Sequence, residues 1–305
     1  MITNLLTVSG QVLVLFCLIA VGFLLAKTGL IQHSAVKSLN NLVLYAALPC
    51  TLISAFQLKL TPDTLHDFLL SFVFSAVFYV LFFIIAHFAV RDKDPHRKRI
   101  LTLSAVLSNC NFMGFPLQTA VIGSMGVFYG SAYSAVTPLF MWTAGVVYLH
   151  GGLRHLNLKK VFLNPGIFGI LIGLFLFLSG IQLPVLLNQG ISYLGSMAVP
   201  VPMLIIGIQL AHTNLRNAVR DRTGWLATGL RLILLPLLGL AIMCVCGVRG
   251  NVLIATTIAA ATPTAVILAM FDNPESTLAA EMVSLQTLCS VVSMPLVVSL
   301  AQTLA

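Results

Sequence analysis

The chain is dominated by apolar runs of about twenty residues, separated by short segments with charged residues, glycine or proline. A helix of this length crosses the hydrocarbon core of a bilayer, which is about 30 Å thick. Only 8% of the residues are charged and 59% are hydrophobic, whereas soluble domains carry about 25% charged residues. So few charges cannot cover a soluble protein of 305 residues. We therefore expect an all-α integral membrane protein whose main surroundings are the lipid bilayer.

The apolar runs predict ten transmembrane helices. They lie near residues 7–26, 38–57, 67–90, 100–122, 127–149, 162–180, 188–211, 223–246, 251–270 and 277–303. Most of the sixteen Lys and Arg residues follow the odd-numbered spans. Because positive loops remain in the cytoplasm, we expect loops 91–99, 150–160 and 212–222 inside and both termini outside, in the cytoplasmic (inner) membrane. The net charge of +8 thus indicates topology, and we expect no nucleic-acid partner.

The two halves of the sequence match weakly but in order. Pairs at an offset of 151 residues include Gly22 with Gly173, Ala47 with Ala198 and Pro49 with Pro200. We therefore predict a first five-helix repeat over 1–150, a linker over 151–160 and a second repeat over 161–305. Because five is odd, the second repeat enters the membrane from the opposite side, as in many secondary transporters.

Proline interrupts two spans at corresponding places, Pro116 in span four and Pro263 in span nine. Proline lacks a backbone donor, so the freed carbonyls in lipid need a partner or a cavity. The run from Ser108 to Pro116, with two asparagines before Gly114 and Pro116, therefore predicts a helix broken at this glycine and proline. Half-helix N-termini near the midplane attract an anion without a buried Lys or Arg. The alternative is a simple proline kink in which the asparagines hold neighbouring helices together.

Three of these stretches resemble the auxin efflux carrier family, which includes the plant PIN carriers and many bacterial permeases. They are residues 40–49 (Asn-Asn-Leu-Val-Leu-Tyr-Ala-Ala-Leu-Pro), residues 111–116 (Asn-Phe-Met-Gly-Phe-Pro) and Thr262-Pro263. The resemblance covers essentially the whole chain. It implies a fold similar to bile-acid sodium symporters and sodium/proton antiporters. Spans four and nine would cross as broken helices in a mobile domain of spans three to five and eight to ten. Spans one, two, six and seven would form a scaffold.

By that resemblance the substrate binds beside the crossing. The implied residues are Asn109, Asn111, Gly114, Pro116, Thr262, Pro263 and Thr264 on one side, and Pro49, Cys50, Thr51 and Leu52 of span two on the other. Thr264 departs from many relatives, which carry proline or an amide at this position. The long central loop of the long plant carriers is absent, as in the bacterial branch.

Two ionisable residues lie inside predicted spans. Arg231 is about 13 Å into span eight, at 1.5 Å per residue, and Glu281 is about one turn into span ten. Intramembrane ionisable residues are functional candidates, so one hypothesis is a structural or gating pair. The other is that Arg231 extends its side chain back to the cytoplasmic face.

These features favour a secondary transporter of a small organic anion, such as malate, malonate, another mono- or dicarboxylate or an auxin-like acid, working by alternating access. A sodium- or proton-coupled symporter or antiporter is the main alternative, and a channel or receptor is a remote one. No His-Glu-x-x-His motif and no mid-span acid occur, so we expect no enzyme, metal or cofactor beyond a coupling ion. A homodimer through the scaffold helices is compatible with this architecture.

Overall fold

The apolar runs fold into helices because backbone groups in lipid must pair within their own segment. The computed structural model describes residues 2–32, 34–152, 154, 163–270 and 277–305. Within these ranges the chain forms helices, and the extended pairing is limited to one isolated bridge. Most of the predicted linker 151–160 lies outside the described residues.

The helices of the first half follow the predicted spans within a few residues. They are α1 (Ile2–Lys27), α2 (Ala35–Leu42), η1 (Val43–Ala47), α3 (Leu48–Ala55), α4 (Pro62–Ala89), α5 (Pro95–Val106), η2 (Cys110–Gly114), α6 (Phe115–Phe140), η3 (Met141–Gly145) and α7 (Val146–His150).

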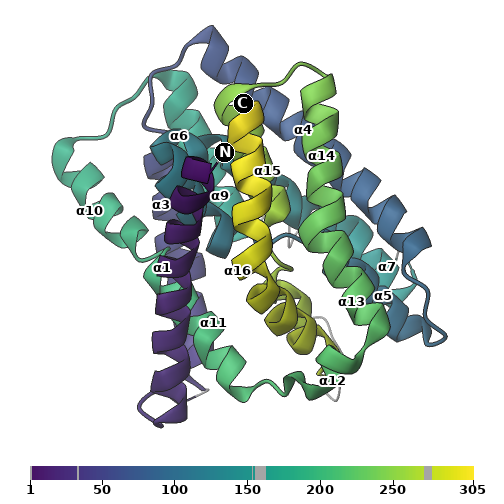
Figure 1. The fold of residues 1–305 in the computed structure, drawn as a ribbon. Coiled ribbons are helices and arrows are strands. Elements are labelled where there is room, and N and C mark those ends of the chain that lie inside the picture. The colour runs from purple at the N-terminus through teal and green to yellow at the C-terminus, as the bar shows by residue number, and fades with distance from the viewer. Residues whose placement is uncertain (1, 33, 153, 155–162, 271–276) are drawn as a thin grey trace.

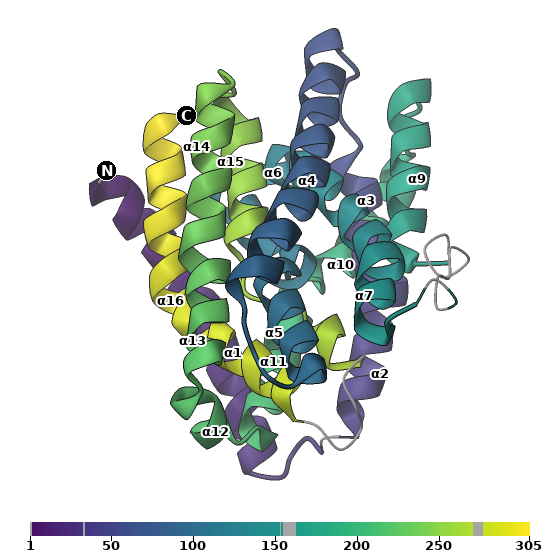
Figure 2. The ribbon, with the colours of Figure 1, turned by 90° about the vertical axis from the view of Figure 1, so that its right-hand side faces the viewer.

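The second half contains α9 (Pro165–Ser179), α10 (Val185–Ser196), α11 (Pro200–His212), α12 (Leu215–Arg220), α13 (Arg222–Gly229), η5 (Leu230–Leu234), α14 (Leu235–Val245), α15 (Gly250–Ala261), η6 (Val266–Met270) and α16 (Leu278–Leu304). Figures 1 and 2 show these helices as one bundle, in which the marked N- and C-terminal ends lie at the same end.

Seven helical stretches of the described chain are long and apolar enough to cross a membrane. They are Leu5–Lys27, Ala35–Ala55, Pro62–Ala89, Cys110–His150, Val185–His212, Arg222–Val245 and Leu278–Leu304. Two shorter apolar helices, Pro165–Ser179 and Gly250–Ala261, accompany them. The protein is therefore a multi-pass membrane protein.

The stretch Cys110–His150 reverses direction inside α6. Gly123 has a φ of +67°, a left-handed conformation that favours glycine. A Cβ atom placed on Gly126 would approach the Gln118 carbonyl oxygen to 2.6 Å. In a straight helix these residues would be about 12 Å apart, at 1.5 Å per residue. The two limbs of α6 therefore pack side by side, with the turn near Gly123, where the sequence places the boundary between spans four and five.

Three π-helical turns stand immediately before prolines. Segments η1, η2 and η5 precede Pro49, Pro116 and Pro236, which occupy the first turns of α3, α6 and α14. A proline ring clashes with the carbonyl four residues earlier and offers no N–H to it. The wider π-turn accommodates that carbonyl without ending the helix.

Glycines set the closest helix contacts. Gly22 of α1 lies against the backbone of Leu204, and Gly207 of α11 lies against the backbone of Ile19. The long helix α1 crosses α11 at this point (Figure 1). Gly169 of α9 similarly lies against Pro49 of α3. With no Cβ atom at these positions, the paired helices approach backbone to backbone.

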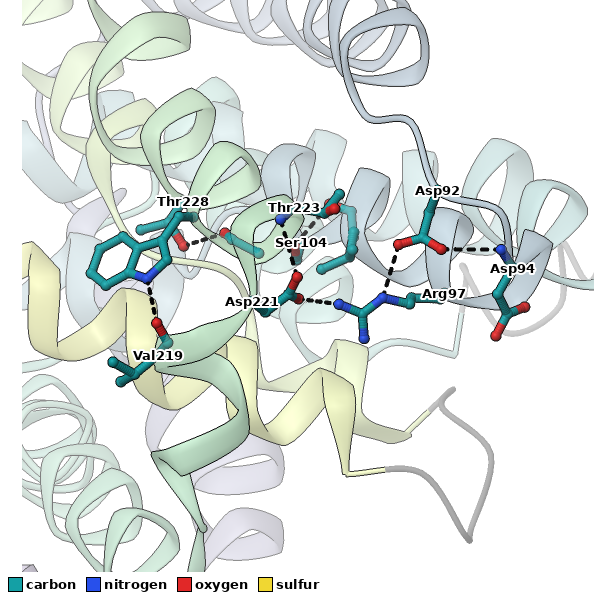
Figure 3. Close-up of polar contacts among 11 residues, drawn as sticks. Asp92, Asp94, Arg97, Ser104, Val219, Asp221, Thr223 and Thr228 are labelled. Atoms are coloured by element: carbon teal, nitrogen blue, oxygen red, sulfur yellow. Dashed lines mark hydrogen bonds and ion pairs between the residues drawn. The ribbon is translucent and has the colours of Figure 1, made fainter.

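An ion-pair bridge joins two basic loops that are remote in sequence (Figure 3). Arg97 Nε donates to Asp92 Oδ2 at 2.8 Å, and Arg97 Nη2 contacts Asp221 Oδ2. Asp221 also caps α13 by accepting from the Thr223 backbone N–H at 3.0 Å. Partial burial lowers the pKa of Arg97, but the two carboxylates outweigh it and raise that pKa above its ordinary value. The bridge ties the segment before α5 to the start of α13.

We expect Arg97→Gln to lower the free energy of unfolding by about 1 kcal/mol, because the pairs are partly exposed and water screens them. Asp221→Asn should cost a similar amount while keeping the cap, and Asp221→Ala should cost about 1 kcal/mol more. Thermal unfolding in detergent measures these differences, with Lys93→Gln as the exposed control. The Arg97→Gln effect should shrink as salt is raised; a salt-independent effect would contradict an electrostatic bridge.

Candidate substrate site at two interrupted helices

Two helices are interrupted at neighbouring points in the interior. Helix α5 ends at Val106, Leu107 is extended with ψ 122°, and the helix resumes at Cys110. Helix α15 ends at Ala261, Thr262 is extended with ψ 152°, and η6 begins at Val266. The predicted interruption at Gly114 and Pro116 is therefore misplaced, because the π-turn η2 absorbs Pro116 and both residues are helical.

The two unwound segments pair with each other in antiparallel fashion. Asn109 N donates to Pro263 O at 2.9 Å, and Ala265 N donates to Leu107 O at 3.1 Å. These bonds flank the isolated bridge between Ser108 and Thr264. Backbone groups that leave a helix inside the membrane must find partners in the protein, and here each interruption supplies the partners of the other.

Ser108 adds a side-chain connection at the same point. Its hydroxyl donates to Ala259 O at 2.5 Å and lies 2.7 Å from Thr262 Oγ1. Thr262 Oγ1 is also 3.0 Å from Ala259 O. Ser108 stands in the polar run that predicts the broken helix, but it was not among the predicted binding residues.

The structure gathers the predicted residues of spans four and nine around this point. Asn109, Gly114, Pro116, Thr262, Pro263 and Thr264 are buried, and Asn111 is partly buried. A Cβ atom on Gly114 would lie 3.6 Å from Thr262 Cγ2, so the π-turn η2 packs against the end of α15. Thr264 N donates to Gln286 Oε1 of α16 at 3.0 Å. Gln286 is a residue that sequence reasoning missed.

Several buried polar atoms near this crossing find no hydrogen-bond partner among the described residues. They are Asn109 Nδ2, Thr264 Oγ1, Gln286 Nε2 and Thr287 Oγ1. Each buried polar group without a partner carries a free-energy cost, so such a cluster needs an explanation. Every group in this set can donate a hydrogen bond. A carboxylate or a bound water would accept hydrogen bonds from these groups.

The residues predicted from span two contact α9 and α10. Thr51 Oγ1 donates to Ala47 O and to Gly195 O of α10, both at 2.9 Å. Pro49 and Leu52 pack against Gly169 of α9, and Cys50 is partly buried. In the described residues, these contacts attach α3 to α9 and α10.

The structure does not bring Arg231 and Glu281 together. Arg231 Nε donates to Thr262 O at 2.8 Å, and Nη1 donates to Val106 O at 3.0 Å. Glu281 Oε1 instead accepts from Thr277 Oγ1 at 2.6 Å. Arg231 is fully buried, so it also does not extend to the cytoplasmic face. Two backbone carbonyls freed by the interruptions accept the hydrogen bonds of Arg231, which therefore neither pairs with Glu281 nor extends to the cytoplasmic face.

An apolar groove of about 470 Å³ lies between α13, η5 and α14 on one side and α16 on the other. Its lining includes Trp225, Leu232, Leu296 and Leu300, and its polar contribution comes from Thr228, Ser293 and Cys289. The Thr228 hydroxyl already donates to Gly224 O at 2.8 Å. A carboxylate would find few hydrogen-bond donors among these side chains.

Comparison with known proteins agrees with this architecture. A family model described as membrane transport protein matches residues 7–157 and 153–298. An uncharacterized transporter of Methanothermobacter thermautotrophicus is 28% identical over 292 residues, covering 93% of this chain and 95% of that protein. An uncharacterized transporter of Methanocaldococcus jannaschii is 24% identical over 221 residues, covering 68% and 70%. The chain therefore belongs to the membrane transport protein family, the auxin efflux carrier family that its motifs resemble.

Proposed function

We propose that the protein is a secondary transporter that carries a small organic anion, a mono- or dicarboxylate such as malate or malonate, by alternating access. The observation that carries the proposal is the cluster of unpartnered buried donors beside two paired helix interruptions. The half-helix from Cys110 to Ile122 directs its positive N-terminal end at this point. Amide groups and a helix end can hold a carboxylate without a buried lysine.

We further propose ten spans. The reversal near Gly123 divides Cys110–His150 into two, and the apolar helices Pro165–Ser179 and Gly250–Ala261 add two more to the other six stretches. The two termini at one end of the bundle support an even number (Figures 1 and 2). The basic loops support a cytoplasmic position for loops 91–99, 150–160 and 212–222.

Glycine packing supports the inverted repeat. Gly22 and Gly173 are 151 residues apart in sequence. Gly22 of the first span packs on Leu204 of the seventh, and Gly173 of the sixth packs on Phe56 of the second. An exchange of the two halves relates these contacts to each other, as an inverted repeat requires.

The proposed mobile and scaffold domains meet through apolar side chains. Phe112 of η2 packs against a buried cluster that includes Val43 and Ile205, and Met113 belongs to a cluster with Val12 and Met203. A contact of this kind has few hydrogen bonds to break when one domain moves against the other. A homodimer through the scaffold helices remains a prediction.

Purified protein in liposomes should show saturable uptake of at least one mono- or dicarboxylate. Asn111→Ala should raise the apparent KM about tenfold or more, because a hydrogen bond to a charged group contributes about 1.5–3 kcal/mol. Asn188→Ala, at an exposed site on α10, is the matched control. Absence of saturable uptake for every acid tested would refute the anion assignment, and conduction faster than carrier turnover would indicate a channel.

A further inference from the structure

Arg231 is the largest side chain that the described protein buries completely. It projects from η5, the π-turn that precedes Pro236 of α14. Its two hydrogen bonds, 2.8 Å to Thr262 O and 3.0 Å to Val106 O, end on backbone carbonyls. Those carbonyls belong to different helices, so one guanidinium group joins both interruptions.

Both carbonyls stand at helix C-termini. Val106 is the last residue of α5, and Thr262 is the C-cap of α15. The final carbonyls of a helix are unpaired and act together as roughly half a negative charge. Two such ends at one point amount to about one negative charge in a low-dielectric interior. The single positive charge of Arg231 matches this requirement.

The charge of Arg231 is permanent and has no acidic partner in the described chain. No carboxylate among the described residues forms an ion pair with it. Tyr79, Tyr133 and Cys110 lie close to it, and none of them carries a carboxylate. A guanidinium does not lose its proton in proteins. Its counter-charge is therefore the pair of helix ends.

We propose that Arg231 is a tethered cation that fills the position where other broken-helix carriers bind a coupling cation. In such carriers, half-helix C-termini and unwound carbonyls coordinate the ion. Here those carbonyls are already taken by a covalently attached charge. The crossing therefore needs no sodium or potassium ion to hold it together. This step rests on the proposed transport function: the protein then transports its substrate independently of sodium and potassium ions.

Thermal unfolding of the purified protein tests the site without transport. Wild-type protein should melt at the same temperature in NaCl, KCl and choline chloride of equal ionic strength. Arg231→Ala should melt roughly 10 °C lower, because the opposing helix ends lose their cation. Millimolar guanidinium chloride, and Na⁺ at higher concentration, should restore a saturable part of that loss by binding in the vacated position. Choline, which is too large, should not.

Arg222→Ala, at an exposed arginine that opens α13, is the control and should melt like wild type in every salt. Arg231→Lys keeps the charge and should be intermediate in stability without acquiring cation dependence.

If Arg231→Ala does not yield folded protein, Arg231→Lys and the wild-type salt series still decide the matter. Saturable Na⁺ stabilisation of the wild type would overturn the proposal. So would an Arg231→Ala protein that no cation stabilises. A wild type that transports no carboxylate would refute the proposed function and leave this test intact.

Discussion

Replacement of Gly207 by alanine is expected to lower the melting temperature by about 10 °C. The added Cβ atom would overlap the carbonyl oxygen of Ile19 and lie 2.6 Å from the backbone nitrogen of Phe23. Both atoms belong to the backbone of α1, so no side-chain rotation relieves the overlap. The helices must separate, and the contact between α1 and α11 is the most extensive helix pairing in the described structure.

The reciprocal substitution Gly22→Ala should have a comparable effect, because its Cβ would overlap the carbonyl of Leu204. Gly10→Ala is the matched control on the same helix, since no atom lies within 4 Å of its Cβ position. Alanine has the higher helix propensity, so this control should be neutral or slightly stabilised. Melting temperatures in detergent distinguish the three variants. A Gly207→Ala protein as stable as wild type would show that α1 and α11 do not meet at this point.

Gly130→Ala is expected to destabilise the protein nearly as strongly as Gly207→Ala does. A second substitution, Gln118→Ala, should restore part of the stability that Gly130→Ala removes. The Gln118 side chain is fully buried, and its Nε2 donates to Ala255 O at 2.8 Å. A Cβ atom on Gly130 would overlap the Gln118 amide group. Moving the amide away would break its hydrogen bond and leave the buried Gln118 N–H group unpaired, at a cost of about 1–3 kcal/mol.

The double variant makes this prediction specific. Gln118→Ala alone should cost stability by leaving a cavity and by removing the bond to Ala255. Because the smaller side chain leaves room for the new methyl group, the double variant should lose less than the sum of the two single losses. Residues 118 and 130 would be about 18 Å apart in one continuous helix, at 1.5 Å per residue, and distant sites contribute additively. Additive losses would therefore contradict the reversal at Gly123.

Local sequence features predicted much of this fold. The apolar runs located the helices because burial in lipid requires about twenty apolar residues and internally paired backbone. The predicted spans 100–122 and 127–149 place a boundary at the reversal, and the left-handed φ of Gly123 shows why glycine stands there. The resemblance of residues 40–49 and 111–116 to the auxin efflux carriers is confirmed by the family match.

The candidate site was only partly predictable. Asn109, Thr262 and Pro263 were expected beside a helix crossing, and they lie next to the paired interruptions. Pro116 was expected at the interruption itself, because proline usually breaks a helix. The structure instead places a π-turn before it. A sequence pattern does not distinguish these outcomes, since both accommodate the missing N–H group.

By itself, the sequence determined the class of protein, the approximate position of each helix along the chain and the prolines that the helices must accommodate. These properties depend on local composition and on single residues such as proline. Only the tertiary structure decided which freed groups meet. Ser108 contacts Thr262, and Arg231 joins Val106 to Thr262 rather than pairing with Glu281. The physical reason is that helix packing brings residues together across more than one hundred positions of sequence, and depth along a helix does not specify its neighbours.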